Sequence, residues 1–422
     1  MSSKKLLRLM LFIDKFKFAS ITIGALLLLT ACGGTPKPTV DETQFATYMS
    51  NKPQELEPSI RKLFSEPKKD IVKYELQAAM DAYHAGYYEL SKRYFDRVLD
   101  NLESYYADTD GATAARSLWH EEGRKDFKGE SYERVMAFYY RGLLYLREGD
   151  LENARAVFKT ASLQDAFAEE EQNRCDFALV VYMQAFTSRL NNDMSLYEDA
   201  MYALNILRPD FKDSLDTNFL FIADTGKSPR KVADGKGHWQ LKYRRGKKFT
   251  DVKAEVSVDG GEFKRMYTME DIFWQATSRG GRVFDKILKG KAEFRSTSES
   301  IGSTLSKAST IAMVAAPLFN ASSVGNVQGA AAGLAVLGGV ASIIAMNANP
   351  HADVRYWNNL PDTVHVLPMK LKKGKHNISY RYLDKNGNIL PELSSSKSIE
   401  VTKKSYIDWT RSREQLSYKY KK

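Results

Sequence analysis

The sequence predicts an α+β protein, with α-helical hairpins in its N-terminal half and antiparallel β-strands in its C-terminal half. Apolar and aromatic residues recur at helical spacing over residues 46–210, whereas alternating apolar residues and turn signals dominate after Pro209. A Gly/Ala-rich apolar stretch, residues 301–350, interrupts the second half and is expected to be helical. These three observations divide the 422 residues into successive segments.

Residues 1–31 are typical of a bacterial secretory leader. Basic residues precede an apolar run at 21–29, which is too short to cross a bilayer because a span needs roughly 20 apolar residues. The tetrapeptide Leu29–Cys32 follows this run and resembles a lipobox, the motif at which bacteria acylate a cysteine and cleave the chain before it. The resemblance implies that Cys32 is lipidated, since several acyl chains anchor a protein stably where one does not. The alternative is an ordinary signal peptide that ends near a cysteine by chance.

The residues after Cys32 indicate where the chain is held. Gly33 stands where an acidic residue would favour retention at the inner membrane, so we expect anchoring in the bacterial outer membrane, facing the periplasm. Residues 32–45 contain a Gly/Pro/Thr-rich stretch and are expected to form a flexible tether. The net charge is +10, and +6 remains once residues 1–31, with five basic residues and one acidic one, are removed. This mildly basic charge suits contact with acidic lipid headgroups, and no nucleic-acid partner is expected for an exported chain.

Residues 46–210 are predicted to form a helical domain of consecutive hairpins. The first hairpin, Ile71–Leu102, turns at Gly86, and the second, Tyr132–Ala161, turns at Gly149. A third hairpin consists of Arg174–Leu190 and Met194–Leu207, and Pro209 ends the array. Each helix has one apolar face, so stacking of the hairpins would bury a continuous core.

The second hairpin carries small and aromatic residues at fixed spacing. Its pattern consists of Phe138, Gly142, Tyr145, Gly149, Ala154, Phe158 and Ala161. This pattern resembles the tetratricopeptide repeat, which implies an α-helical solenoid over residues 46–210. Gly142 and Ala154 are expected to let two helices approach closely, while Phe158 fills the space between hairpins. The alternative is an unrelated helical bundle.

Two further motifs, Phe127–Arg134 and Arg355–Pro361, resemble segments of a little-characterised family of bacterial envelope lipoproteins. That family pairs a tetratricopeptide-like N-terminal half with a mixed C-terminal half, so the resemblance implies an accessory envelope role and transfers no catalytic residue. The residues themselves favour a structural role. The charged side chains of the first motif are expected to cap a helix, and Trp357 is expected to be a core residue that locks the Gly-rich segment to a neighbouring sheet.

Residues 211–300 are expected to contain a β-hairpin and a basic helix. A strand is predicted at Asn218–Ala223, and the alternating run Val252–Val258 precedes a turn at Asp259–Gly261. A helix is predicted over Asp271–Phe294, and its positive tail follows another basic run at Arg244–Lys248. Either this region faces anionic lipid or polysaccharide, or its charges are a solvated face.

Residues 351–422 are expected to form a small antiparallel β unit. Strands are predicted at Thr363–Leu371, at Asn377–Leu383 and at Ser398–Trp409. Turn signals at Lys373-Gly374 and at Asn386-Gly387 separate the first two strands and follow the second. The prediction therefore treats this segment as a meander whose strands pair with one another.

The Gly/Ala-rich segment 301–350 has three open interpretations. Gly325, Gly329 and Gly333 recur every four residues, so they lie on one face of a helix and permit close backbone contact. The uncharged run 329–346 is at the lower limit of length for spanning a bilayer. The segment is therefore expected to be a buried hairpin, a membrane-inserted element or a surface for self-association.

No motif predicts catalysis, a cofactor or a metal site. The six histidines are dispersed, and no nucleophile elbow, phosphate loop or dinucleotide fingerprint occurs. We therefore expect a non-enzymatic, membrane-anchored scaffold or adaptor, held through acylated Cys32, whose helical array binds an envelope protein in its concave face. The alternatives are a membrane-inserting or oligomeric component of an export or surface-assembly machine, and a regulator of cell-wall synthesis.

Overall fold

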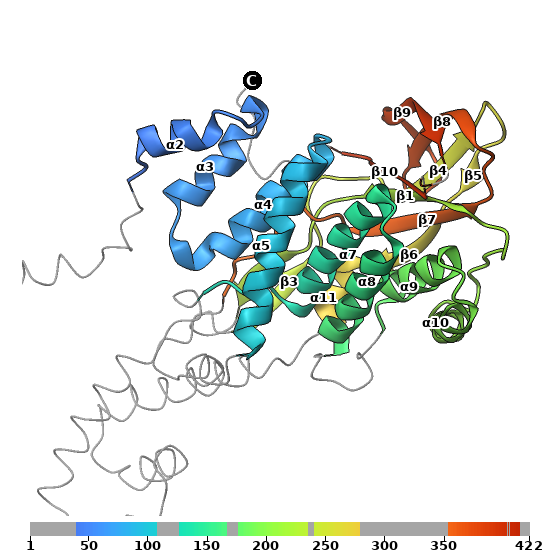
Figure 1. Ribbon diagram of the computed structural model, residues 1–422, viewed down its shortest axis with the longest axis horizontal. Coiled ribbons are helices and arrows are strands. Elements are labelled where there is room, and N and C mark those ends of the chain that lie inside the picture. The colour runs from blue at the N-terminus through green and yellow to red at the C-terminus, as the bar shows by residue number, and fades with distance from the viewer. Residues whose placement is uncertain are drawn as a thin grey trace, which may run out of the picture.

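The computed structural model describes residues 39–107, 126–166, 176–234, 240–278, 353–402, 404 and 406–413. In these residues, helices pack on one side of two stacked β-sheets (Figure 1), which confirms the predicted α+β class. Cys32, the glycines at 325, 329 and 333, and all of segment 301–350 lie outside the described residues. No helix in the described part is long and apolar enough to cross a membrane.

The described chain begins with short helices that precede the hairpins. They are α2 (Glu42–Met49), η2 (Gln54–Leu56), α3 (Glu57–Ser65) and η3 (Lys68–Asp70). The Asp41 carboxylate accepts hydrogen bonds from the backbone N–H groups of Thr43 and Gln44, at 3.0 and 3.1 Å. This N-cap fixes the helix start at Glu42, so helical structure begins inside the segment 32–45 that was expected to be flexible.

Three helical hairpins follow, at the positions that the sequence predicts. Their helices are α4 (Ile71–His84) and α5 (Tyr88–Ala107), α7 (Ser131–Glu148) and α8 (Leu151–Ala166), and α9 (Ala178–Leu190) and α10 (Met194–Leu207). Each hairpin turns at a residue with positive φ, namely Gly86, Gly149 and Asn192. The relation of these hairpins to the tetratricopeptide repeat stays a prediction.

Close packing of α7 on α8 depends on Gly142. A Cβ atom at this position would lie 2.3 Å from a ring carbon of Phe158, a distance far inside van der Waals contact. Phe158 and Ala154 are fully buried beneath it. The sequence interpretation of Gly142 as a site of close helix approach is therefore confirmed.

The first sheet has the strand order β10-β1-β7-β6 and the second has the order β5-β4-β8-β9. The first contains β1 (Phe219–Thr225), β6 (Tyr267–Asp271), β7 (Thr363–Met369) and β10 (Ile407–Arg411). The second contains β4 (Lys253–Val258), β5 (Lys264–Arg265), β8 (Gly374–Leu383) and β9 (Ile389–Val401). A separate ribbon joins β2 (Arg230–Asp234) to β3 (Gln240–Arg244), and α11 (Ile272–Ser278) follows β6.

Strand β1 is buried on both faces, and every one of its residues is inaccessible to solvent. Leu220 and Ile222 point into the core shared with the helices, whereas Phe219 and Phe221 belong to the core between the two sheets. Successive side chains of a β-strand point to opposite faces of the sheet, so β1 has an apolar environment on each face. The molecule therefore has three layers, with the first sheet between the helices and the second sheet.

The C-terminal strands do not form the self-contained meander that the sequence suggested. Strand β7 lies between β1 and β6, β8 pairs with β4 as well as β9, and β10 pairs with β1 in parallel. The expected single strand Ser398–Trp409 is two strands in different sheets, because β9 ends at Val401 and β10 begins at Ile407. These pairings satisfy the backbone groups along both edges of β1, which solvent cannot reach.

We predict that Gly142→Ala destabilises the protein by about 1–3 kcal/mol, because the added methyl group overlaps the Phe158 ring. Helix propensity alone would predict the opposite, a gain of about 1 kcal/mol. Urea unfolding of the variant measures the change. In a Phe158→Leu background, Gly142→Ala should cost less, and an equal cost in both backgrounds would show that the two residues do not interact.

Candidate functional site

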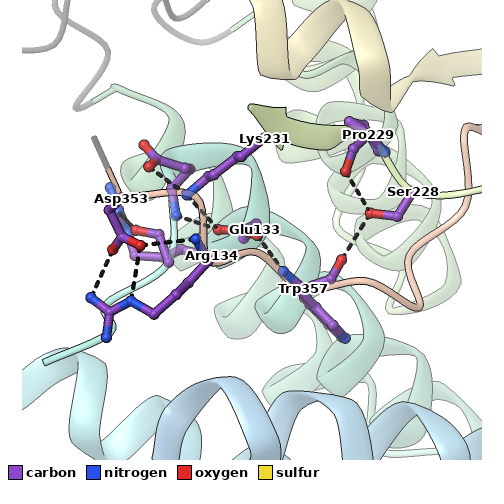
Figure 2. Close-up of polar contacts among 10 residues, drawn as sticks. Glu133, Arg134, Ser228, Pro229, Lys231, Asp353 and Trp357 are labelled. Atoms are coloured by element: carbon purple, nitrogen blue, oxygen red, sulfur yellow. Dashed lines mark hydrogen bonds and ion pairs between the residues drawn. The ribbon is translucent and has the colours of Figure 1, made fainter. Parts of the chain in front are cut away.

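The motifs Phe127–Arg134 and Arg355–Pro361 meet inside the protein, although more than 200 residues separate them in the sequence. Residues 353–361, here called the strap, run against α4, α5, α7 and the start of β2. The backbone N–H of Trp357 donates to Glu133 Oε1 at 2.6 Å, and the Ser228 hydroxyl donates to the carbonyl of Trp357 at 2.8 Å (Figure 2). Both backbone groups of Trp357 are therefore held by side chains from distant segments.

Glu133 is the centre of this junction. Its Oε2 accepts a hydrogen bond of 2.6 Å from the backbone N–H of Glu130, which is the N-cap of α7, while its Oε1 holds the strap. The first of these contacts is part of a capping box, as the charged residues of the motif suggested. Burial raises the pKa of the Glu133 carboxyl, and the nearby Lys231 ammonium lowers it. One carboxylate thus starts a helix and fixes the strap.

Lys231 brings the β-ribbon into the same junction. Its side chain is 1% exposed, and Nζ lies 2.7 Å from Glu130 Oε1 and 3.8 Å from Glu133 Oε2 (Figure 2). A buried ammonium between two carboxylates stabilises the fold only while all partners are present, since any one of them left alone would be an unpaired buried charge. No sequence signal pointed to Lys231, because it is one of two adjacent basic residues in a short strand and belongs to no motif.

Arg355 forms the second ion-pair group of the strap. Its guanidinium contacts Asp353 through two nitrogens, at 2.7 and 2.9 Å, and reaches Asp70 Oδ1 at 2.5 Å. Burial raises the pKa of Asp353, but the hydrogen bonds and charge of Arg355 outweigh it and hold that pKa below its usual value. Asp70 immediately precedes α4, so this arginine ties the start of the strap to the helical array.

The middle of the strap is apolar and packs on helices. Trp357 is fully buried, with ring centroids of Phe95 and Tyr140 each 6.2 Å away, which confirms it as a core residue. Asn359 donates from Nδ2 to the carbonyl of Gln77 and to Asp81 on α4. The described polar and aromatic partners of the strap are largely on the helices. The expectation that these residues lock the Gly-rich segment to a sheet stays a prediction, because that segment lies outside the described residues.

The junction holds the strap against the helices and does not form a pocket, because its charged side chains contact one another and are mostly buried. It fixes Asp353, which directly follows the undescribed residues 279–352. On the other side of that segment, α11 also packs on α7. α11 packs on β3 and β7 as well, so α7 is one contact that the two flanks of residues 279–352 share.

A second buried carboxylate joins the helices to the first sheet. Asp224, at the end of β1, accepts hydrogen bonds from the Tyr140 hydroxyl of α7 at 2.7 Å and from Trp409 Nε1 of β10 at 3.1 Å. Burial raises the pKa of Asp224 to about 6, although Arg411 and the two donors act in the opposite direction. The strand predicted from the sequence, Asn218–Ala223, stops one residue before Asp224, and no sequence signal indicated this role.

The other sequence-derived candidates are not brought together. Arg245 of the basic run pairs with Asp271 and Asp362, so part of the expected positive patch is used within the fold. Within the described ranges, no group of His, Cys, Asp and Glu side chains has an arrangement that could hold a metal. Residues 279–295, the remainder of the basic region, lie outside the described residues. No family model, curated protein or solved structure matches the chain.

We predict that Lys231→Met costs about 3–5 kcal/mol in unfolding free energy, because it leaves Glu130 and Glu133 buried without their cation. Adding Glu130→Gln removes one of these charges and should recover part of the loss. Chemical denaturation gives both values. Lys92→Met is the matched control, since it breaks the more exposed pair with Glu148 and should cost at most about 1 kcal/mol. Equal losses of unfolding free energy for the two lysine variants would contradict a special role of Lys231 in this junction.

The raised pKa of Asp224 predicts that the stability of the protein depends on pH. Its pKa is about 6 in the folded protein and 3.8 in an exposed carboxyl, so its stabilising contribution is complete below pH 3.8 and is lost as pH rises through 6. Between pH 4 and pH 8, wild type should lose roughly 2–3 kcal/mol relative to Asp224→Asn, as measured by denaturant unfolding. The exposed control Asp199→Asn should show no such change, and parallel curves for Asp224→Asn would disprove the assignment.

Proposed function

We propose that this protein is a lipoprotein of the bacterial outer membrane that acts as a protein-interaction scaffold in the cell envelope. The observation that carries the proposal is the lipobox-like tetrapeptide Leu29–Cys32 after a short apolar run. Acylation of Cys32 would anchor the chain, and the first helix of the described residues begins soon afterwards, at Glu42. The folded body would thus be held close to the periplasmic face of the membrane.

The construction of the body supports a scaffold. A continuous core extends from Phe45 near its start to Ile407 near its end, so the helices and the first sheet form one packed unit. Strand β1 joins this unit to the separate core between the two sheets. Nearly all residues of α7 and α9 are buried, which means that the chain's own strap and sheet cover these inner helices. A partner would therefore bind to the outer helices instead of the concave face that the sequence suggested.

A membrane-inserting component of an export or surface-assembly machine is the second candidate. One observation favours it: α7 contacts both flanks of residues 279–352, the segment that contains Gly325, Gly329 and Gly333. In that case the described body would brace the segment in a bilayer. The two candidates differ in whether the protein stays with the membrane once its acyl chains are removed.

We predict that Cys32→Ser moves the protein from the membrane fraction to the soluble fraction, because no acylated residue remains to anchor it. Fractionation of cells with an outer membrane, together with mass spectrometry of the mature N-terminus, tests this. Cys175→Ser is the matched control, since it removes the other cysteine and should leave the protein in the membrane fraction. A Cys32→Ser protein that is cleaved normally and stays in the pellet would refute the lipobox.

The same variant separates the two candidate functions. Washing membranes with alkaline carbonate releases peripheral proteins and retains inserted ones. The Cys32→Ser protein should be fully released if the protein is a scaffold. Retention after the wash would favour the membrane-inserting component instead.

A further inference from the structure

Helix α10 ends the helical array and has one uncovered face. α5 lies between α4 and α7, and α8 lies between α7 and α9, but α10 packs mainly against α9 (Figure 1). Tyr202 and Ile206 on its outer side are 74% and 68% exposed. Solenoid arrays normally end in a repeat with a polar outer face, so large apolar side chains at this position need an explanation.

The three hairpins can be aligned through the residue of positive φ at each turn, which is Gly86, Gly149 or Asn192. The fifth and twelfth residues after it are buried in all three outer helices. These residues are Ser91 and Val98 in α5, Ala154 and Ala161 in α8, and Tyr197 and Leu204 in α10. Because the buried positions coincide, equivalent positions on α5, α8 and α10 point in equivalent directions.

The alignment identifies four positions that can contact the next hairpin, and each of α5 and α8 uses two of them. In α5 they are the sixth and tenth residues, which contact α7 through the pairs Lys92–Glu148 at 2.9 Å and Asp96–Arg141 at 2.6 Å. In α8 they are the third and thirteenth residues. Glu152 accepts a hydrogen bond of 2.5 Å from Asn191 at the end of α9, and Ser162 accepts one of 2.7 Å from Gln184 in the middle of α9. Positions three, six, ten and thirteen form one stripe along a helix.

On α10 the same stripe consists of Ser195, Glu198, Tyr202 and Asn205, and all four are exposed. Ile206 lies beside it, one turn beyond Tyr202. We propose that this stripe binds an α-helix of a partner protein, which extends the array as α7 follows α5 and α9 follows α8. The inference rests on the proposed scaffold function and assigns the partner site of that scaffold.

The charges on α10 define the chemistry of the partner. The helix contains no Lys or Arg, and Glu198 and Asp199 are exposed on its outer side, although the chain as a whole has a net charge of +10. A basic, amphipathic helix complements this surface, with apolar residues against Tyr202 and Ile206 and with Lys or Arg near the two carboxylates. A second copy of α10, or an anionic membrane surface, would bring like charges together.

Photo-crosslinking in living cells tests the site. The full chain with a photoreactive phenylalanine analogue in place of Tyr202 is irradiated, and the linked peptide is sequenced by mass spectrometry. We expect one major product, whose linked peptide comes from another protein and belongs to a basic amphipathic helix. The matched control carries the analogue in place of Lys159, an exposed residue at the tenth position of α8, a helix that contacts α9 through positions three and thirteen instead.

Charge reversal by Glu198→Lys together with Asp199→Lys should lower the yield at least about fivefold, since it repels a basic partner. Thermal unfolding should be unchanged, because both side chains are exposed. A link to a second copy, a link to lipid, a yield no higher than at Lys159 or indifference to charge reversal would each overturn the proposal.

The crosslinking result and the membrane-fractionation result can fail independently of each other. A protein that fractionates with the membrane but gives no Tyr202 crosslink would overturn the α10 site and leave the anchor intact. A wild-type protein that is soluble yet crosslinks as expected would overturn the anchor and leave the site intact.

Discussion

The structure depends on the buried carboxylate of Glu133, which satisfies backbone groups of two segments at once. One oxygen caps the start of α7, and the other holds the backbone of Trp357 in the strap. Lys231 compensates the charge from a third segment. Because a buried carboxylate is stable only with such partners, the helix start, the strap and the β-ribbon must assemble together.

Strand β1 extends this interdependence to the whole fold. It supplies side chains to both cores, and its two neighbours, β7 and β10, come from the last part of the chain. The helices therefore acquire a sheet to pack on only when the C-terminal residues have joined β1. Asp224 at the end of this strand adds a polar connection, through Tyr140 and Trp409, between the layers.

This architecture also determines which surfaces are left for a partner. Helical arrays commonly bind ligands on their concave face, but here the chain covers α7 and α9 with its own residues. The outer helices remain, and among them α10 combines exposed apolar residues with acidic ones. If the protein is a scaffold, its inner helices are already covered by its own chain, whereas α10 has an exposed face. A partner would then bind at the end of the array, away from the core.

The sequence by itself determined the helical hairpins and most strands. Periodicity, the turn at Gly149 and the small residue Gly142 are local features that act within a few residues or within one hairpin. Only the tertiary structure decided which strands pair, and that Lys231 and Asp224 are buried at junctions. The physical reason is that pairing and charge burial depend on contacts between segments far apart in the chain, and no short-range pattern specifies their partners.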